Sequence, residues 1–242
     1  MTDAPAATAR LARRLLCVML LALTGCAETE TAVGLDGSVR LFSDDPAQPV
    51  FGRASDWVEL GKTAAMAPAI VTEGGRTILE ISARGENAAL IRRLDAPLLA
   101  MPFLFWDWSA VDGAPDHPVR LVVGFEDRRT APARTFNWGL GPAEPPPFSR
   151  SLALVWGASA LQRGSIEVAA SGEGGRPHAR YVVRGGRENG SRWWPEHLDL
   201  SQLHAAAWPN VDMAASRVVF VGISTAAGAG GSMRLAGLRL SR

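Results

Sequence analysis

Apolar and polar side chains alternate along much of the chain after residue 70, which is the period of a β-strand with one buried face. The clearest examples are the segments 118–126 and 178–185, PVRLVVGFE and HARYVVRG. Shorter apolar runs predict further strands at 76–83, 87–93, 103–109, 151–157, 217–224 and 231–241. Turn-forming Gly, Asn, Asp and Pro separate these runs.

About ten strands at this spacing predict an all-β fold, a single antiparallel β-sandwich that we expect to be a jelly roll. One segment departs from the alternation. The run 198–208, LDLSQLHAAAW, predicts a short helix with Asp199 or Ser201 as its N-cap and Pro209 beyond its end. No repeat and no second domain boundary is visible.

Charged residues lie opposite the apolar faces of the predicted strands. Parity pairs Arg120 with Glu126 in one strand and Arg180 with Arg184 in another, and Asp107 lies on one face of a third. If these strands are neighbours, their charges form one polar sheet surface suited to a hydroxyl-rich ligand. Trp138 and Trp193, in turn-rich segments, are candidate stacking groups for that ligand, whereas the alternative is a solvated face of ion pairs.

The stretch 102–113, PFLFWDWSAVDG, places Trp106 and Trp108 on the same face of a strand. Tryptophan serves both as a platform for sugar rings and as a large core side chain. Regular inward alternation explains the pair without a ligand, so we expect at least one of the two to be core.

The N-terminal residues 1–25 predict a secretory signal, because basic Arg10, Arg13 and Arg14 precede a short apolar run. The run ends in LTGC, which resembles a bacterial lipobox and predicts lipidation at Cys26. Ala27 after this cysteine implies sorting to the outer membrane. We expect a polar tether at 26–37 and the sandwich at 38–242.

The net charge and the number of cysteines further limit the partners and metal sites that we expect. The leader removes three arginines and Asp3, so the chain from Cys26 onward carries 22 basic and 23 acidic residues. Near-neutral charge gives no electrostatic case for nucleic acid. The two cysteines are Cys17 in the leader and Cys26, so neither a disulfide nor a cysteine-based metal site is expected.

Catalytic motifs give little support for an enzyme. No G-x-S-x-G nucleophile elbow occurs. His197 and His204 are too few to form a zinc site, which needs three or four ligands. Asp116 and His117 are typical of a turn between two prolines. No metal or cofactor is expected. Carboxylates are the remaining candidates for glycoside chemistry, which needs two at a defined separation. These candidates are Asp107, Glu126, Glu167 and Glu196.

The order of several motifs resembles a bacterial family of secreted proteins catalogued only as a domain of unknown function. The matching segments, spread over roughly residues 50–242, are W-x-W at 106–108, VRLVVGFED at 119–127, LALVWG at 152–157, RYVVRGG at 180–186, W-x-x-E at 193–196 and VVFVGIS at 218–224. Ser109 replaces a basic residue of relatives, and 225–232 replaces an acidic loop. The resemblance implies a jelly-roll-like sandwich akin to carbohydrate-binding modules, with no catalytic residues to carry over.

We therefore expect a lipid-anchored cell-envelope protein that binds a saccharide or another polar ligand without catalysis. The predicted ligand-binding residues are Asp107, Arg120, Glu126, Trp138, Arg180, Arg184 and Trp193. Two alternatives stay open. One is an envelope-polysaccharide enzyme with paired carboxylates, and the other is a structural or protein-interaction lipoprotein.

Overall fold

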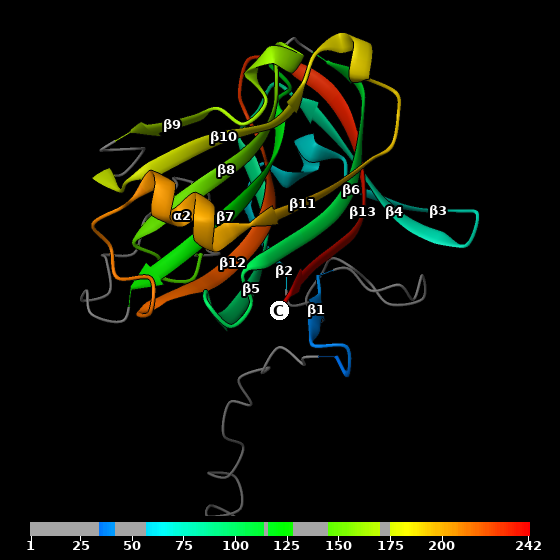
Figure 1. The fold of residues 1–242 in the computed structure, drawn as a ribbon. Helices are drawn as coiled ribbons and strands as arrows, with labels where there is room; N and C mark the ends of the chain where they lie inside the picture. The colour runs from blue at the N-terminus through cyan, green and yellow to red at the C-terminus, as the bar shows by residue number, and fades with distance from the viewer. Residues whose placement is uncertain (1–33, 42–56, 114–115, 128–144, 170–174) are drawn as a thin grey trace, which may run out of the picture. The chain divides into compact units, whose positions relative to one another are not determined.

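A computed structural model of the chain describes residues 34–41, 57–113, 116–127, 145–169 and 175–242. All of them belong to one compact unit, which consists mainly of two β-sheets (Figure 1). The predicted signal, its lipobox and Trp138 lie outside these ranges. Within the described ranges, no helix combines the length and the apolar character needed to cross a bilayer.

The first sheet, sheet A, has six strands in the order β11-β6-β13-β4-β3, and β1 also pairs with β13. The strands are β1 (Ser38–Arg40), β3 (Ala69–Glu73), β4 (Arg76–Arg84), β6 (Phe103–Gly113), β11 (Trp194–Asp199) and β13 (Gly230–Ser241). All pairings in this sheet are antiparallel.

The second sheet, sheet B, has seven strands in the order β2-β5-β12-β7-β8-β10-β9. The strands are β2 (Trp57–Gly61), β5 (Ala88–Pro97), β7 (Val119–Asp127), β8 (Arg150–Gly157), β9 (Ile166–Ala169), β10 (His178–Gly185) and β12 (Ser216–Thr225). The pairing of β8 with β10 is parallel, and the other pairings of this sheet are antiparallel.

The path of the chain between the sheets is that of a jelly roll. From β4 in sheet A it crosses to β5 in sheet B, returns to β6, and crosses again to β7 and β8. It later runs through β11 and β12 to β13, alternating sheets again. The result is β4-β13-β6-β11 facing β5-β12-β7-β8, the two interlocked Greek keys of a jelly roll. The predicted all-β sandwich is confirmed.

The predicted short helix is also present, as α2 (Leu200–Ala207). Asp199 is its N-cap, and the Asp199 carboxylate accepts the backbone N–H groups of Ser201 and Gln202. The strand β11 runs directly into this cap. Short 3-10 helices follow β2, β8 and β10, at Thr63–Met66, Ala160–Gln162 and Arg187–Asn189.

The core lies between the sheets and includes both tryptophans of β6. Trp106 is 2% exposed and Trp108 is fully buried. The Trp108 ring packs edge-on against Trp106 and against Trp156 of β8, each with centroids 5.5 Å apart. The pair therefore fills the core, as expected for at least one member, and neither ring is a sugar platform.

Candidate functional site

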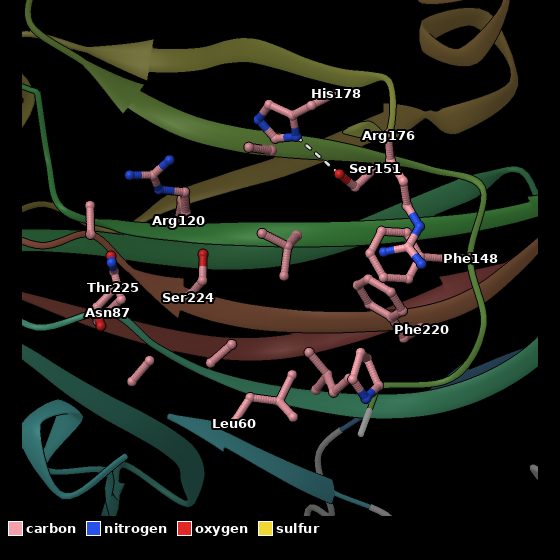
Figure 2. Close-up of a pocket in the computed structure, with 17 residues that line it drawn as sticks. Leu60, Asn87, Arg120, Phe148, Ser151, Arg176, His178, Phe220, Ser224 and Thr225 are labelled. Atoms are coloured by element: carbon pink, nitrogen blue, oxygen red, sulfur yellow. Dashed lines mark hydrogen bonds between the residues drawn. The ribbon is translucent and has the colours of Figure 1, made fainter. Parts of the chain in front are cut away.

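The outer face of sheet B, opposite the core, carries a pocket of about 210 Å³ (Figure 2). It extends across the sheet from β2 to β10. Its floor consists of the outward-facing apolar side chains Leu60, Ala89, Ile91, Val122 and Ala153. Its polar lining consists of Asn87, Arg120, Ser151, Arg176, His178, Ser224 and Thr225.

The pocket results from the alternation of inward and outward side chains along the strands of sheet B. In β7, Leu121 and Val123 face the core, so Arg120 and Val122 face outward. On the neighbouring strand β8 the outward residue of the floor is Ala153. Small side chains at the middle of the sheet leave space that larger ones at the same positions would fill.

Two phenylalanines close one end of the pocket. Phe148, just before β8, packs edge-on against Phe220 of β12 with ring centroids 5.2 Å apart. The guanidinium of Arg176 lies over the Phe148 ring, 4.5 Å from its centroid (Figure 2). The Phe220 ring covers Gly124, where a Cβ atom would clash with it. Both rings are buried, so this end is an apolar wall capped by a cation.

Hydrogen-bonding groups lie between the two ends. Ser151 Oγ and His178 Nδ1 are 3.0 Å apart (Figure 2). When the hydroxyl donates to Nδ1, the neutral imidazole keeps its proton on Nε2. Burial lowers the pKa of His178, and the nearby charge of Arg120 lowers it further. At neutral pH His178 is therefore an uncharged hydrogen-bonding group.

Positive charges gather at the end of the pocket opposite the two phenylalanines, where Arg120 and Arg180 are neighbours. Arg180 donates to Asp116 at 2.9 Å and lies 3.8 Å from Glu167. Arg120 makes no hydrogen bond or ion pair with any described residue. Burial lowers its pKa, the Arg180 charge lowers it further, and Asp116 has the opposite effect. Arg120 is thus a desolvated cation without a bonded counter-ion in the described part of the chain.

Glu126 lies on the same outward face of β7 but beyond the pocket lining. Burial raises the pKa of its carboxyl, while the charge of Arg150 acts to lower it. Its Oε2 atom is buried and has no hydrogen-bond partner among the described residues. The prediction that Arg120 and Glu126 share a face is confirmed, because β7 pairs with β12 without skipping any of its own residues from Val119 to Asp127.

Arg184 does not share a face with Arg180, so that part of the prediction is wrong. The ladder between β10 and β8 shifts between Val182 and Arg184, where a β-bulge reverses the alternation. Arg184 consequently points between the sheets. It donates to Glu196 Oε1 at 2.6 Å and stacks over Trp194 at 3.8 Å.

Asp107 lies in the other sheet from Arg120, because β6 belongs to sheet A. It pairs with Arg76. The Trp193 ring lies close to two guanidiniums of this sheet, those of Arg76 at 4.8 Å and Arg234 at 5.4 Å. The single polar surface expected from parity is therefore wrong. Its members are divided between the two sheets, and Trp138 lies outside the described residues.

The four candidate carboxylates do not form a facing pair. Asp107 lies on sheet A, Glu167 on the edge strand β9, and Glu196 between the sheets. Neither these three nor Glu126 lines the pocket, whose described lining has no carboxylate. The described lining of this pocket therefore lacks the two carboxylates that glycoside hydrolysis requires.

The contacts of His117, His197 and His204 are those of residues that stabilise the fold. His117 is buried in its turn, where Nε2 bonds to the carbonyls of Asp112 and Ser232 and Nδ1 accepts the N–H of Val119. His204 is buried against Phe125, whereas His197 stacks on Phe105 at the surface. Among the described residues, no group of three or more potential ligands is placed to hold a metal ion.

Sequence reasoning missed most of the pocket lining. His178 and Ser224 were within predicted strands, and His178 has the same parity as Arg180. Extending the parity argument to every polar residue of those strands would have found them. Asn87 is the first residue of the predicted strand 87–93 and lies just before β5 in the structure. Phe148 and Arg176 enter from segments next to strands, and no sequence periodicity marks them.

No protein-family model matches the chain, and no curated protein matches it in sequence. Among solved structures, a family 11 carbohydrate-binding module from Clostridium thermocellum, in complex with a mixed-linked tetrasaccharide, has a TM-score of 0.42 at 10% identity, covering 80% of this chain and 93% of that one. A family 12 xyloglucanase from Bacillus licheniformis has a TM-score of 0.44 at 10% identity, covering 84% and 99%. These low scores do not establish a common fold, and the jelly-roll assignment rests on the strand order itself.

Proposed function

We propose that this chain is a non-catalytic binding protein of the cell envelope whose sandwich holds a saccharide or similar polar ligand in the outer pocket of sheet B. The observation that carries the proposal is the composition of this pocket. Convergent polar groups surround an apolar floor, which is the usual build of a small-molecule site. Its volume of about 210 Å³ suits a single ring or a comparable part of a larger ligand.

The lack of carboxylates in the described lining supports binding without glycoside hydrolysis. A glycosidase needs a proton donor and a second carboxylate on opposite sides of the scissile bond. The described lining supplies guanidiniums, hydroxyls, an amide and one imidazole, but no carboxylate. These groups can orient and hold a hydroxylated ligand.

The membrane anchor is a separate part of the proposal and rests on the sequence alone. The basic leader and the lipobox ending in Cys26 support acylation, and Ala27 supports sorting to the outer membrane. Metabolic labelling with a palmitate analogue should mark the wild type and leave Cys26→Ala unmarked. Equal labelling of the two would reject the anchor without affecting the pocket.

The binding proposal is tested with the full chain, purified in detergent, on an array of neutral and acidic oligosaccharides. Val122→Trp places a large ring in the middle of the floor and should abolish binding. Val168→Trp, on the exposed edge strand β9, is the matched control and should bind as the wild type does. Thermal melts within a few degrees of each other establish that both variants fold.

A wild type that binds no glycan on the array contradicts the saccharide proposal. Binding that survives Val122→Trp places the ligand elsewhere and removes the pocket from the account. Binding lost equally in both tryptophan variants would also contradict it, because only one of them fills the pocket.

A further inference from the structure

Arg120 stands out among the charges of the pocket. Its neighbour Arg180 already has two carboxylate partners, Asp116 and Glu167. At the opposite end, Arg176 lies on Phe148 and is attracted by the charge of Glu126. Asp116 attracts Arg120 too, but the charge of Arg180 opposes it. Arg120 forms no hydrogen bond or ion pair with a described residue, so its positive charge has no bonded counter-ion there. A bound anion would supply the charge-assisted hydrogen bonds that this guanidinium lacks.

The polar groups between the ends limit what else the ligand can be. Asn87 and Ser224 line the pocket beside Arg120, and the Ser151–His178 pair lies across it (Figure 2). A purely hydrocarbon ligand would cover these groups without pairing them, which costs free energy. A sugar ring offers hydroxyls to them and places its C–H face on the aliphatic floor.

Deepening the proposed function, on which this inference rests, we propose that the pocket binds an acidic saccharide unit through a carboxylate held by Arg120. The planar guanidinium can meet a carboxylate with two parallel N–H···O bonds. One guanidinium without a bonded counter-ion balances one negative charge. A phosphate monoester carries about −1.5 to −2 at neutral pH, which exceeds it.

The test compares methyl glucuronide with methyl glucoside, which share one ring and differ in a carboxylate in place of a hydroxymethyl group. Binding to the full chain in detergent micelles is measured by NMR titration. We expect the glucuronide to bind at least about tenfold more tightly, with an advantage that shrinks as salt is added. Glucose 6-phosphate and cyclohexanecarboxylate, tested alongside, separate the carboxylate from phosphate and the sugar from a plain apolar acid, and both should bind more weakly than the glucuronide.

Arg120→Met removes the charge while keeping an unbranched side chain of similar reach. It should remove the advantage of the glucuronide, so that the two glycosides bind the variant equally. Arg187→Met, at an exposed arginine of the 3-10 helix after β10, is the matched control and should change neither.

The outcomes separate this inference from the proposed function. Equal binding of glucuronide and glucoside, both lost in Val122→Trp, overturns the acidic ligand and keeps the saccharide pocket. Tighter binding of the phosphate or of cyclohexanecarboxylate also overturns the acidic saccharide. If neither sugar nor any array glycan binds, the proposed function fails as well.

Discussion

Arg184 of sheet B donates its Nε–H to Glu196 of sheet A across a distance of 2.6 Å, joining the two layers of the sandwich. Both side chains are almost completely excluded from solvent. Glu196 Oε1 also accepts the indole N–H of Trp108 at 3.2 Å. The bulge in β10 that turns Arg184 inward thus connects a core tryptophan, a buried ion pair and the opposite sheet.

Glu196→Gln should destabilise the fold by about 3–5 kcal/mol, because it leaves the Arg184 charge buried without its partner. Urea unfolding followed by circular dichroism measures the loss. Arg163 approaches the same carboxylate at 3.7 Å but is largely exposed, so Arg163→Ala should cost less than about 1 kcal/mol. A Glu196→Gln protein as stable as the wild type would mean that the pair does not join the sheets.

Gly124 is required because the Phe220 ring occupies the space of a side chain there. Gly124→Ala should cost about 1–3 kcal/mol through overpacking. In a Phe220→Leu background the same substitution should cost clearly less, since the ring is gone. Gly230→Ala, where a Cβ meets only ordinary contacts, is the strand control and should be nearly neutral. Additive costs of Gly124→Ala and Phe220→Leu in a double-mutant cycle would reject the proposed contact.

Burial lowers the pKa of His204 to about 4, and the charge of Arg150 contributes in the same direction. An unfolded histidine has a pKa of about 6.5, so the unfolded chain binds the proton first as the pH falls. Neutral His204 therefore makes its full contribution to the free energy of unfolding above about pH 6.5. This contribution is lost as the pH falls from about 6.5 to 4. At 1.36 kcal/mol per pH unit, the loss totals about 3 kcal/mol.

His204→Asn should flatten the fall in unfolding free energy between pH 6.5 and 4, even if it lowers stability at every pH. His197→Asn removes an exposed imidazole and should preserve the slope. Chemical denaturation at a series of pH values gives the slopes. Identical slopes for His204→Asn and the wild type would contradict a depressed pKa at His204.

Core and surface tryptophans should respond differently to truncation. Trp108→Ala should cost about 3–5 kcal/mol, because the ring is fully buried between the sheets. Trp193→Ala removes only partly exposed contacts with two guanidiniums and should cost about 1 kcal/mol. Thermal melts compare the two. Equal costs would contradict the assignment of Trp108 to the core and Trp193 to the surface.

Sequence periodicity predicted the fold well where strands have one buried face. The segment 178–185 is β10 residue for residue, and 118–126 matches β7 within one residue. Short strands such as β2 and β9, of five and four residues, have too few alternating positions to stand out. Strand β11 was partly included in the predicted helix, because Leu198 and Asp199 end the strand just where the helix cap begins.

The candidate site was harder to predict, for two physical reasons. Parity shows which residues share a face of one strand, but not in which sheet that strand lies, so it cannot separate Asp107 from Arg120. A bulge adds one residue and reverses parity without a sequence signature, so parity alone puts Arg184 on the wrong face. Arg120 and Arg180 do share the outer face of sheet B, because Arg120 pairs with Ser224 and Arg180 with Ala153 in regular parts of their ladders.

The proposals above all place the ligand in the outer pocket of sheet B. A crystal structure of the full chain with the tightest-binding oligosaccharide from the array would locate it. We expect ordered sugar over Val122 and Ala153, with an oxygen within about 3.2 Å of the Arg120 guanidinium. Sugar bound instead against Trp193 and Asp107 on sheet A, with the sheet B pocket free of it, would reject that location.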